Sequence, residues 1–461
     1  MILPEALMLK SKSYITEGPL FKSIVRFAIP ILIAALIQNL FHSADMIVIG
    51  NMADSTAVAS VGATANITGL VLNAFISLAG GTSVLLARSV GAGNEGRCKR
   101  IVDTSIYFSI FIGAIVAIIG NVVSVPLLRA LDTPAECFDG AVTYLRIYMS
   151  GIPAIMIYNY GSAVIRAEGD SRRPLIYAIV SGLVNVGLNL VLCLIMENKV
   201  AAVAIATIVS QAVGAVLVMV RMMVNKGACR FTFKNPSFSF AELGQLMRFG
   251  IPGAIVTLMY PVASLQITGA VNSYGTACVA GCSAATNVES LTAVTYAAFS
   301  SALLTFMSQN IGAGNKDRVN KSMLYCTIVA VALGSIGLFI YTFFPEPILS
   351  IYVPGDAEAI FYGMKRMKYV LAFQMIAALN GILSAVLQAF GYPTFSSLNS
   401  IISILGLRLL WMNFIYPIAP SIDLLLVCFT CSWSLILIIN ISFVIPLLVR
   451  FRKRGFAAIK G

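Results

Sequence analysis

Long apolar runs dominate this chain and restrict the folds open to it. Hydrophobic residues make up 59% of its 461 residues and charged residues only 11%, against about 25% charged residues in a soluble domain. The runs extend over about 20–28 residues, enough for a helix to cross a hydrocarbon layer of roughly 30 Å. They are too long and continuous for barrel strands. Because lipid offers the backbone no hydrogen-bond partner, we predict an all-α integral membrane protein.

The runs divide into twelve expected transmembrane helices, six in each half of the chain. They lie near residues 24–50, 57–86, 101–125, 140–166, 175–196, 200–224, 247–273, 280–308, 322–344, 362–388, 395–419 and 422–450. The predicted domains are an N-terminal segment (1–23), an N-lobe (24–224), a polar and basic linker (225–246), a C-lobe (247–450) and a C-terminal tail (451–461).

The two halves repeat one another in sequence. Arg26–Pro30 returns as Arg248–Pro252, and Gly91–Arg97 returns as Gly312–Arg318. Since each half holds an even number of spans, both halves enter the membrane from the same side, and the repeat is parallel. Two repeated six-helix bundles around a shared pathway are typical of a transporter.

Basic residues predict the orientation. Most of the 31 Lys and Arg lie in the N-terminal segment, the linker, the C-terminal tail and the loops on the same side as these. Because basic loops stay inside, both termini are expected in the cytoplasm of a multi-pass protein of the plasma (inner) membrane. The net charge of +12 is mostly this bias, so we expect the lipid bilayer as a partner and no nucleic acid. No cleavable signal peptide is visible in residues 1–23, and we expect a monomer.

Several motifs that would indicate an enzyme lack their context. The Gly91-x-Gly93-x-x-Gly96 spacing fits a dinucleotide fingerprint, but it follows an expected membrane helix, and the second copy has Asp317 in place of the third glycine. We interpret both copies as tight, basic turns. No GxxxxGK[ST] sequence exists, so ATP is not the expected energy source.

Metal and redox chemistry find little support either. The CxxC of Cys428 and Cys431 lies within an apolar span, and His42 is the only histidine. We therefore expect no cofactor and no enzyme.

Asp45 is the first of two acids that fall within expected spans and away from the first few residues of the span. It lies in the outer part of the first span, where a carboxylate facing lipid would be costly, so we expect it to face a protein cavity. A buried carboxylate can hold either a proton or a cation, as an ion-coupled switch requires. The alternative is an interfacial acid near the helix end, since Gly50 and Asn51 follow.

Glu289, in the eighth span, is the second intramembrane acid, and its counterpart in the repeat is Thr68. It is a candidate second coupling or substrate-binding acid. The alternative is a structural acid that pairs with a neighbouring polar group or with Arg408.

Two amides share a helix face in the fifth span. Asn185 and Asn189 are four residues apart, and Thr207 of the sixth span could add a hydroxyl. Amide and hydroxyl oxygens can ligate a hard cation, but amides also hydrogen bond between membrane helices. Other polar and aromatic side chains are candidates for a substrate cavity: Gln38, Asn66, Tyr158, Tyr260, Asn287 and Arg408.

The whole pattern resembles the multidrug and toxic compound extrusion (MATE) family of prokaryotes. The twelve-span repeat, the segment Gln38–Asp45 and the run Met307–Asn315 carry the resemblance over roughly residues 20–450. It implies an antiporter that uses inward sodium or proton flow to expel drugs, often organic cations. Two six-helix lobes would alternate between outward-facing and inward-facing states.

The resemblance also assigns the coupling residues. The family's first-span Asp matches Asp45, and its N-lobe cation site matches Asn185, Asn189 and Thr207, so Na⁺ or H⁺ is the implied coupling ion there. Asn189 stands where an Asp is usual, which removes one fixed charge and weakens the case for tight sodium binding. The seventh-span Glu of some members has no match, because Met259–Pro261 is uncharged.

Two other functions are possible for a chain of this kind. A lipid-linked oligosaccharide flippase shares a related two-lobe design but usually lines its cavity with several basic residues, whereas Arg408 is the one basic residue expected deep inside a span. A membrane-embedded enzyme would need His, Asp or Glu clustered near one face, which the spans do not supply.

Overall fold

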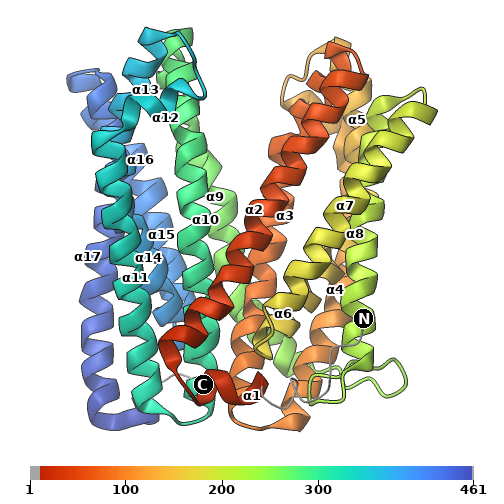
Figure 1. Cartoon of the computed structure of the whole chain (residues 1–461), viewed down its shortest axis with the longest axis vertical. Helices are drawn as coiled ribbons and strands as arrows, with labels where there is room; N and C mark the ends of the chain where they lie inside the picture. Colours follow the sequence, from red (N-terminus) through yellow and green to blue (C-terminus); the bar gives the residue numbers. More distant parts are fainter. Residues whose placement is uncertain (1–10, 459–461) are drawn as a thin grey trace. The chain divides into compact units, whose positions relative to one another are not determined.

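The chain is described here by a computed structural model covering residues 11–458, which is helical throughout and contains no strand over that range (Figure 1). The first half forms α1 (Ser11–Thr16), α2 (Leu20–Met52), α3 (Ser55–Gly91), α4 (Glu95–Ala130), α5 (Ala135–Ser150), α6 (Ile152–Ala167), α7 (Arg172–Ile195) and α8 (Lys199–Val224).

The second half repeats long helices but contains more breaks. Its α-helices are α9 (Phe240–Asn272), α10 (Thr276–Gly312), α11 (Lys316–Phe343), α12 (Pro345–Ser350), α13 (Ala357–Tyr369), α14 (Gln374–Ala389), α15 (Pro393–Ile401), α16 (Leu407–Leu410) and α17 (Ile422–Arg454). Short 3₁₀ segments are η2 (Leu371–Phe373), η5 (Tyr416–Ile418) and η6 (Gly455–Ala458), and π-helical segments are η3 (Ile402–Gly406) and η4 (Trp411–Ile415).

The predicted all-α membrane fold with twelve spans is confirmed. Over the described residues, 11 helices are long and apolar enough to cross a membrane, and there are 12 spans if α5 and α6, bent by 46°, count as one. Large apolar side chains point outward from these helices, as Phe111, Ile118 and Val122 do on α4 with exposures of 66%, 66% and 71%. Such a surface suits lipid rather than water.

The helices form two compact units, which we describe separately. The first contains Ile29–Ala254, and the second contains Ser13–Ala28 together with the chain from Ile255 onward. The divisions fall inside α2 and α9, beside Pro30 and close to Pro252. The lobes expected at 24–224 and 247–450, with a linker at 225–246, stay a prediction.

In the first unit, the segment after α8 folds back onto α4. Phe231 is fully buried, and its ring contacts that of Tyr107 at 5.7 Å. The backbone N–H of Ser237 donates to Asp103 Oδ2 (2.9 Å), and that of Ser239 donates to Thr104 Oγ1 (3.0 Å). This segment is therefore packed against the first unit.

Close helix contacts in the second unit rely on small residues. A methyl group added to Gly281 on α10 would lie 2.0 Å from the carbonyl oxygen of Ala359 on α13. Small residues let helix backbones approach one another where lipid provides no hydrophobic driving force. This contact continues into an apolar core that includes Val288, Leu371 and Phe429.

The repeated glycine turns have the same conformation in both units. Gly93 and Gly314 have φ of +66° and +71°, which glycine adopts without a steric cost. Asn94 and Asn315 follow them and cap α4 and α11, accepting hydrogen bonds from the backbone N–H groups of Arg97 and Arg318. Both copies are therefore tight turns that start a helix.

The equivalent arginines then hold equivalent segments. Arg97 donates to Glu242 Oε1 (3.1 Å) and Gln245 Oε1 (2.7 Å) at the start of α9. Arg318 donates to the carbonyl oxygens of Ile15 and Gly18, ahead of α2. The first unit thus holds the start of α9, the first long helix of the second half. The second unit holds the segment before α2, the first long helix of the first half.

Candidate ion and substrate site

Helices α2 and α7 bring Asp45 against the two predicted amides. Asp45 is 8% exposed, and Asn189 is fully buried. Asn189 Nδ2 donates to Asp45 Oδ1 at 2.5 Å and lies 3.4 Å from Asn185 Oδ1. Because Asn185 and Asn189 are one turn apart on α7, both face the same carboxylate. The structure therefore brings together three of the four residues predicted for the ion site.

A close approach between α2 and α7 makes this arrangement possible. Gly182 on α7 lies against the ring of Phe41, one turn before Asp45, and a methyl group on Gly182 would lie 1.6 Å from a carbon of that ring. A larger residue there would force the Phe41 ring, or α2 itself, to move. This glycine therefore helps to set the distance between Asp45 and the amides.

Asp45 borders a cavity of about 70 Å³ within the first unit. At about 10–15 Å³ for each water, this volume holds several waters. Its polar lining comes from four helices: Gln38, Asp45, Tyr158, Asn159, Ser181, Asn185, Thr207, Ser210 and Gln211. The cavity therefore adds Thr207 to the ion site and brings Gln38 and Tyr158, both predicted for a substrate cavity, next to it.

The electrostatics of this cavity favour a cation or a proton. Among the described side chains, no Lys or Arg forms an ion pair with Asp45, and both of its neighbours on α7 are neutral amides. Asn189 Oδ1 is buried without a hydrogen-bond partner. A buried carboxylate without a counter-charge is costly until a positive charge or a proton joins it.

Oxygen atoms dominate the possible ligands. Thr207 Oγ1 donates its proton to Val203 O (2.9 Å), so its lone pairs can face the cavity. With Asp45, Asn185 and Asn189 it forms the oxygen-rich set that a hard cation prefers. Over residues 11–458, no group of three or more His, Cys, Asp or Glu could hold a metal ion. These four side chains could hold one Na⁺ or a proton.

Glu289 in the second unit has a partner that the sequence did not predict. Arg366 on α13 donates to Glu289 Oε2 at 2.8 Å, with side-chain exposures of 9% and 15%. The alternative of an acid paired with a neighbouring polar group thus agrees with the structure, with Arg366 and not Arg408 as the partner. Arg366 lies near the start of the expected span 362–388 and is 8% exposed, so it is buried within the second unit.

Arg408 itself is fully buried between helices of the second unit. Its guanidinium carbon lies 4.4 Å from the centre of the Phe429 ring and 5.3 Å from that of Tyr260. Nε and Nη1 donate to the hydroxyls of Ser432 and Ser264, both at 3.4 Å. No acid among the described residues forms an ion pair with it.

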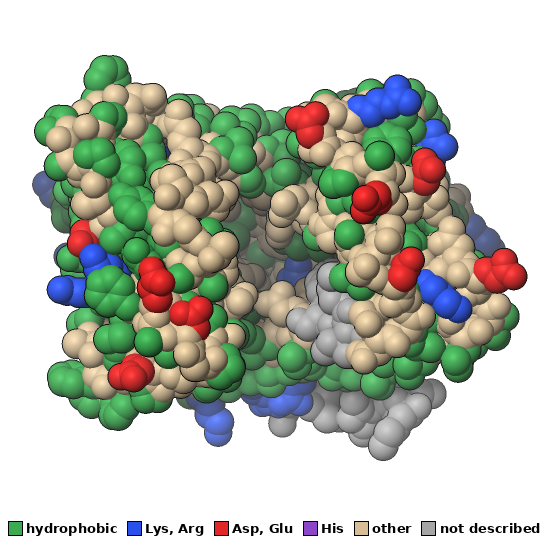
Figure 2. Space-filling model, turned by 90° about the horizontal axis from the view of Figure 1, so that it is seen from above, with side chains coloured by type: hydrophobic (Ala, Val, Ile, Leu, Met, Phe, Trp, Pro, Cys, Tyr) green, Lys and Arg blue, Asp and Glu red, His purple; other side chains and the backbone are tan. Residues whose placement is uncertain are grey.

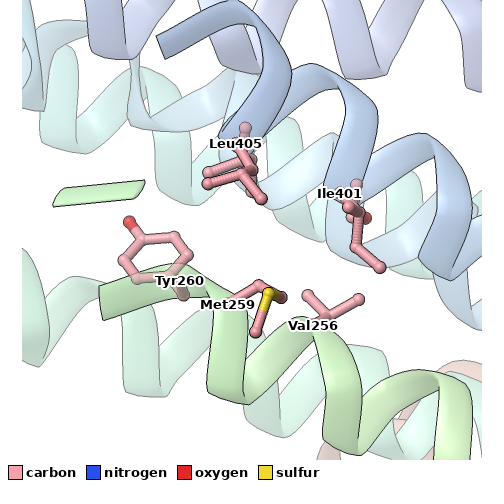
Figure 3. A pocket seen from close by; sticks show the side chains of 7 residues that line it. Val256, Met259, Tyr260, Ile401 and Leu405 are labelled. Carbon is pink, nitrogen blue, oxygen red and sulfur yellow. The ribbon is translucent and has the colours of Figure 1, made fainter. Parts of the chain in front are cut away.

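Tyr260 also borders a small apolar cavity of about 10 Å³ in the second unit. Figure 3 shows Val256, Met259 and Tyr260 on α9 facing Ile401 and Leu405 across this cavity. The volume is smaller than about one water. The side chains therefore nearly close the space between α9 and the chain of α15 and η3.

The remaining predicted residues lie elsewhere. Asn66 and Asn287 are exposed and border neither of these two cavities. Their role in binding substrate stays a prediction. The side chain of His42 lies outside the described part of the structure. The sequence analysis missed Gln211 and Ser210, although their spacing of four and three residues from Thr207 puts them on the same helix face.

These features define a multi-pass helical membrane protein with two repeated units and a buried acid in one of them. A family model described as MatE matches residues 30–191 and 252–412, one copy in each half. The chain therefore belongs to the MatE family of transporters.

Relatives and solved structures agree with this assignment. The chain is 24% identical over 446 residues to the probable multidrug resistance protein YoeA of Bacillus subtilis, covering 92% of this chain and 95% of YoeA. It is 26% identical to the probable multidrug resistance protein NorM of Thermotoga maritima, covering 84% of each chain. A MOP superfamily transporter from Pyrococcus furiosus shares the fold with a TM-score of 0.86, at 20% identity over 96% of this chain and 99% of that one.

Proposed function

We propose that this protein is a secondary active antiporter that exports drugs, often organic cations, in exchange for H⁺ or Na⁺ by alternating access. Membership of the MatE family and relatives named as multidrug resistance proteins support transport of this kind. The observation that carries the coupling mechanism is the lone carboxylate of Asp45, held by Asn189 inside a cavity.

Coupling would arise because the cationic drug and the coupling ion both interact with the single negative charge of Asp45. A proton or Na⁺ at Asp45 removes the charge that holds a cationic drug in the same cavity. Transport requires that the two ligands prefer different conformations, since a ligand that binds both conformations equally shifts neither. Asp45 would therefore exchange the drug for the ion on the outer side and release the ion on the inner side.

Replacement of the usual Asp by Asn189 shapes the ion preference. A single carboxylate with two amides has one formal charge, so it can hold one proton or one Na⁺ at a time. The Asn189 amide can turn either its N–H₂ or its oxygen toward Asp45. It donates to the ionised acid and accepts from the protonated acid or ligates a cation.

The orientation proposed for the chain places both termini in the cytoplasm, as a protein of the plasma membrane. Figure 2 shows one end of the molecule, where acidic and basic side chains are scattered among apolar and uncharged ones. The basic linker and the basic turns around Arg97 and Arg318 each follow an even-numbered expected span, which puts them on the same side as the termini in the predicted topology. This placement supports a basic side that faces the cytoplasm.

Proteoliposomes test the proposal directly. Efflux of ethidium is measured with a pH gradient alone, with a sodium gradient alone, and with neither. We expect one gradient to drive efflux in the native protein, and Asp45→Asn to abolish driven efflux at unchanged protein level. Asn is close in shape to Asp, so the lost titratable charge is the main difference. Driven efflux by Asp45→Asn at the native rate would refute the proposal.

The flippase and enzyme alternatives are less well supported. A flippase would need several free basic groups for a pyrophosphate, but Arg366 is already paired with Glu289. Family membership points to a transporter rather than an enzyme.

A further inference from the structure

The second unit holds more buried positive than negative charge around Phe429. The guanidinium carbons of Arg366 and Arg408 lie 4.9 Å and 4.4 Å from the centre of that ring. Glu289 neutralises Arg366 at 2.8 Å. Arginine keeps its proton in proteins, so Arg408 leaves one uncompensated positive charge.

Arg408 also has an unused hydrogen-bond donor. Its two contacts to Ser432 and Ser264 are long at 3.4 Å, and Nη2 is buried without a partner. A buried guanidinium with neither a carboxylate nor full hydrogen bonding is unfavourable in a membrane protein unless a ligand completes it. The geometry of the guanidinium suits two oxygens of a carboxylate or phosphate.

The backbone around Arg408 is irregular on both sides. The four-residue α16 that carries it lies between the π-helical segments η3 and η4. π-Helical turns are rare in proteins, and those that do occur are frequently found at functional sites. They provide a second, independent indication that this position serves more than packing.

The neighbouring cavity suggests what the rest of the ligand is like. Tyr260 contacts both Arg408 and the cavity between α9 and η3, whose other lining is mostly apolar. Met259 is flexible and can move aside. An aromatic group that displaces Met259 could therefore stack beside Tyr260, while its acidic group reaches Arg408 Nη2 and Ser264.

We propose that Arg408, with Ser264 and Ser432, forms an anion-binding subsite in the second unit for the carboxylate or phosphate of an aromatic solute. This rests on the proposed transport function and specifies its substrates further. They would include aromatic anions and zwitterions as well as cations. The uncompensated guanidinium of Arg408 carries the proposal.

Tryptophan fluorescence offers a local probe. The chain has two tryptophans, and Trp433 contacts the Phe429 ring at 6.5 Å. Trp411→Phe leaves Trp433 as the one tryptophan, and excitation at its red edge avoids the tyrosines. The full-length protein in phosphatidylcholine nanodiscs is titrated with 1-naphthoate, 1-naphthyl phosphate and the neutral 1-naphthamide. We expect one of the anions to quench Trp433 saturably, and the amide to bind at least roughly tenfold more weakly.

Variants at the subsite separate binding from folding. Arg408→Gln should weaken anion binding at least roughly tenfold, and Arg408→Lys should restore only part of it, because lysine lacks the planar fork. Should Arg408→Gln fail to fold, Ser264→Ala keeps the charge and should weaken binding several-fold. Equal binding of the anions and the amide, or native anion binding by a folded Arg408→Gln, would overturn the proposal.

A lipid could supply the same anionic chemistry. Nanodiscs with phosphatidylglycerol distinguish the two sources. If that lipid quenches Trp433 and displaces naphthoate in an Arg408-dependent way, the subsite binds lipid and the solute proposal fails. Ethidium efflux by the native protein is scored separately. Anion binding without driven efflux would therefore contradict the antiporter while leaving the subsite in place.

Discussion

The ion pair between Glu289 and Arg366 gives a prediction whose size follows from its burial. The two side chains are 15% and 9% exposed, and Arg366 also lies over the Phe429 ring. Glu289→Gln removes one charge and leaves the guanidinium of Arg366 buried without a counter-charge. Loss of one partner of a buried pair typically costs about 3–5 kcal/mol, and we expect about 3 kcal/mol because Gln can still accept one hydrogen bond.

A double-mutant cycle isolates this interaction. Glu289→Gln, Arg366→Gln and the double variant are compared with the native protein by denaturant unfolding in detergent. We expect each single variant to lose stability and the double variant to lose much less than the sum. A coupling free energy below about 0.5 kcal/mol, the usual limit of additivity, would refute the reasoning.

The same variants decide the role of Glu289 in transport. If the acid is structural, efflux by Glu289→Gln should fall only as far as the amount of folded protein falls. The double variant should then recover most of the efflux. A double variant that is stable but transports no better than Glu289→Gln would assign Glu289 to coupling or substrate binding.

Three further predictions concern other parts of the molecule. Asn189→Asp adds a second carboxylate beside Asp45 and should lower the Na⁺ concentration for half-maximal efflux at least tenfold, because a second charge about 4 Å away is worth a few kcal/mol even in a polar protein environment and tenfold requires only about 1.4 kcal/mol. An unchanged sodium dependence contradicts this. Gly281→Val forces a branched side chain against α13 and should lower stability by about 1–3 kcal/mol or more, whereas a native melting temperature would show that the helices part freely. Burial raises the pKa of Glu168 in the loop after α6, partly opposed by a hydrogen bond from Asn225. Because the pKa of Glu168 is higher in the folded than in the unfolded protein, the neutral acid favours folding at low pH, and this contribution is lost as pH rises through the folded pKa. Glu168→Gln should therefore be more stable than the native protein at neutral pH. Unfolding measured as a function of pH should show this difference disappear on acidification.

The sequence predicted the grouping of Asp45, Asn185 and Asn189 because that grouping depends largely on local spacing. Asn185 and Asn189 share a face simply because four residues make one helical turn, and an acid within a span must face protein. The approach of Phe41 to Gly182 is different, since it depends on how α2 packs against α7. No periodicity in either segment reveals it.

The second unit was harder to predict because its spans are broken. Arg366 belongs to α13, which ends at Tyr369, and the chain then passes through η2 into α14. A single continuous helix over this span would therefore point the Arg366 side chain in a different direction. Its partner, Glu289, lies 77 residues earlier. Pairing over such a distance follows from helix packing, which one sequence does not determine.

The exchange of lead-in segments constrains how such a protein could have arisen. The first turns of α2 are packed within the second unit, and the start of α9 is packed within the first. A half-length ancestor with the same packing could not have completed its own bundle. Two identical copies would have exchanged the first turns of their first long helices. The ancestral form would therefore have been an intertwined homodimer, and gene fusion would later have joined its two subunits.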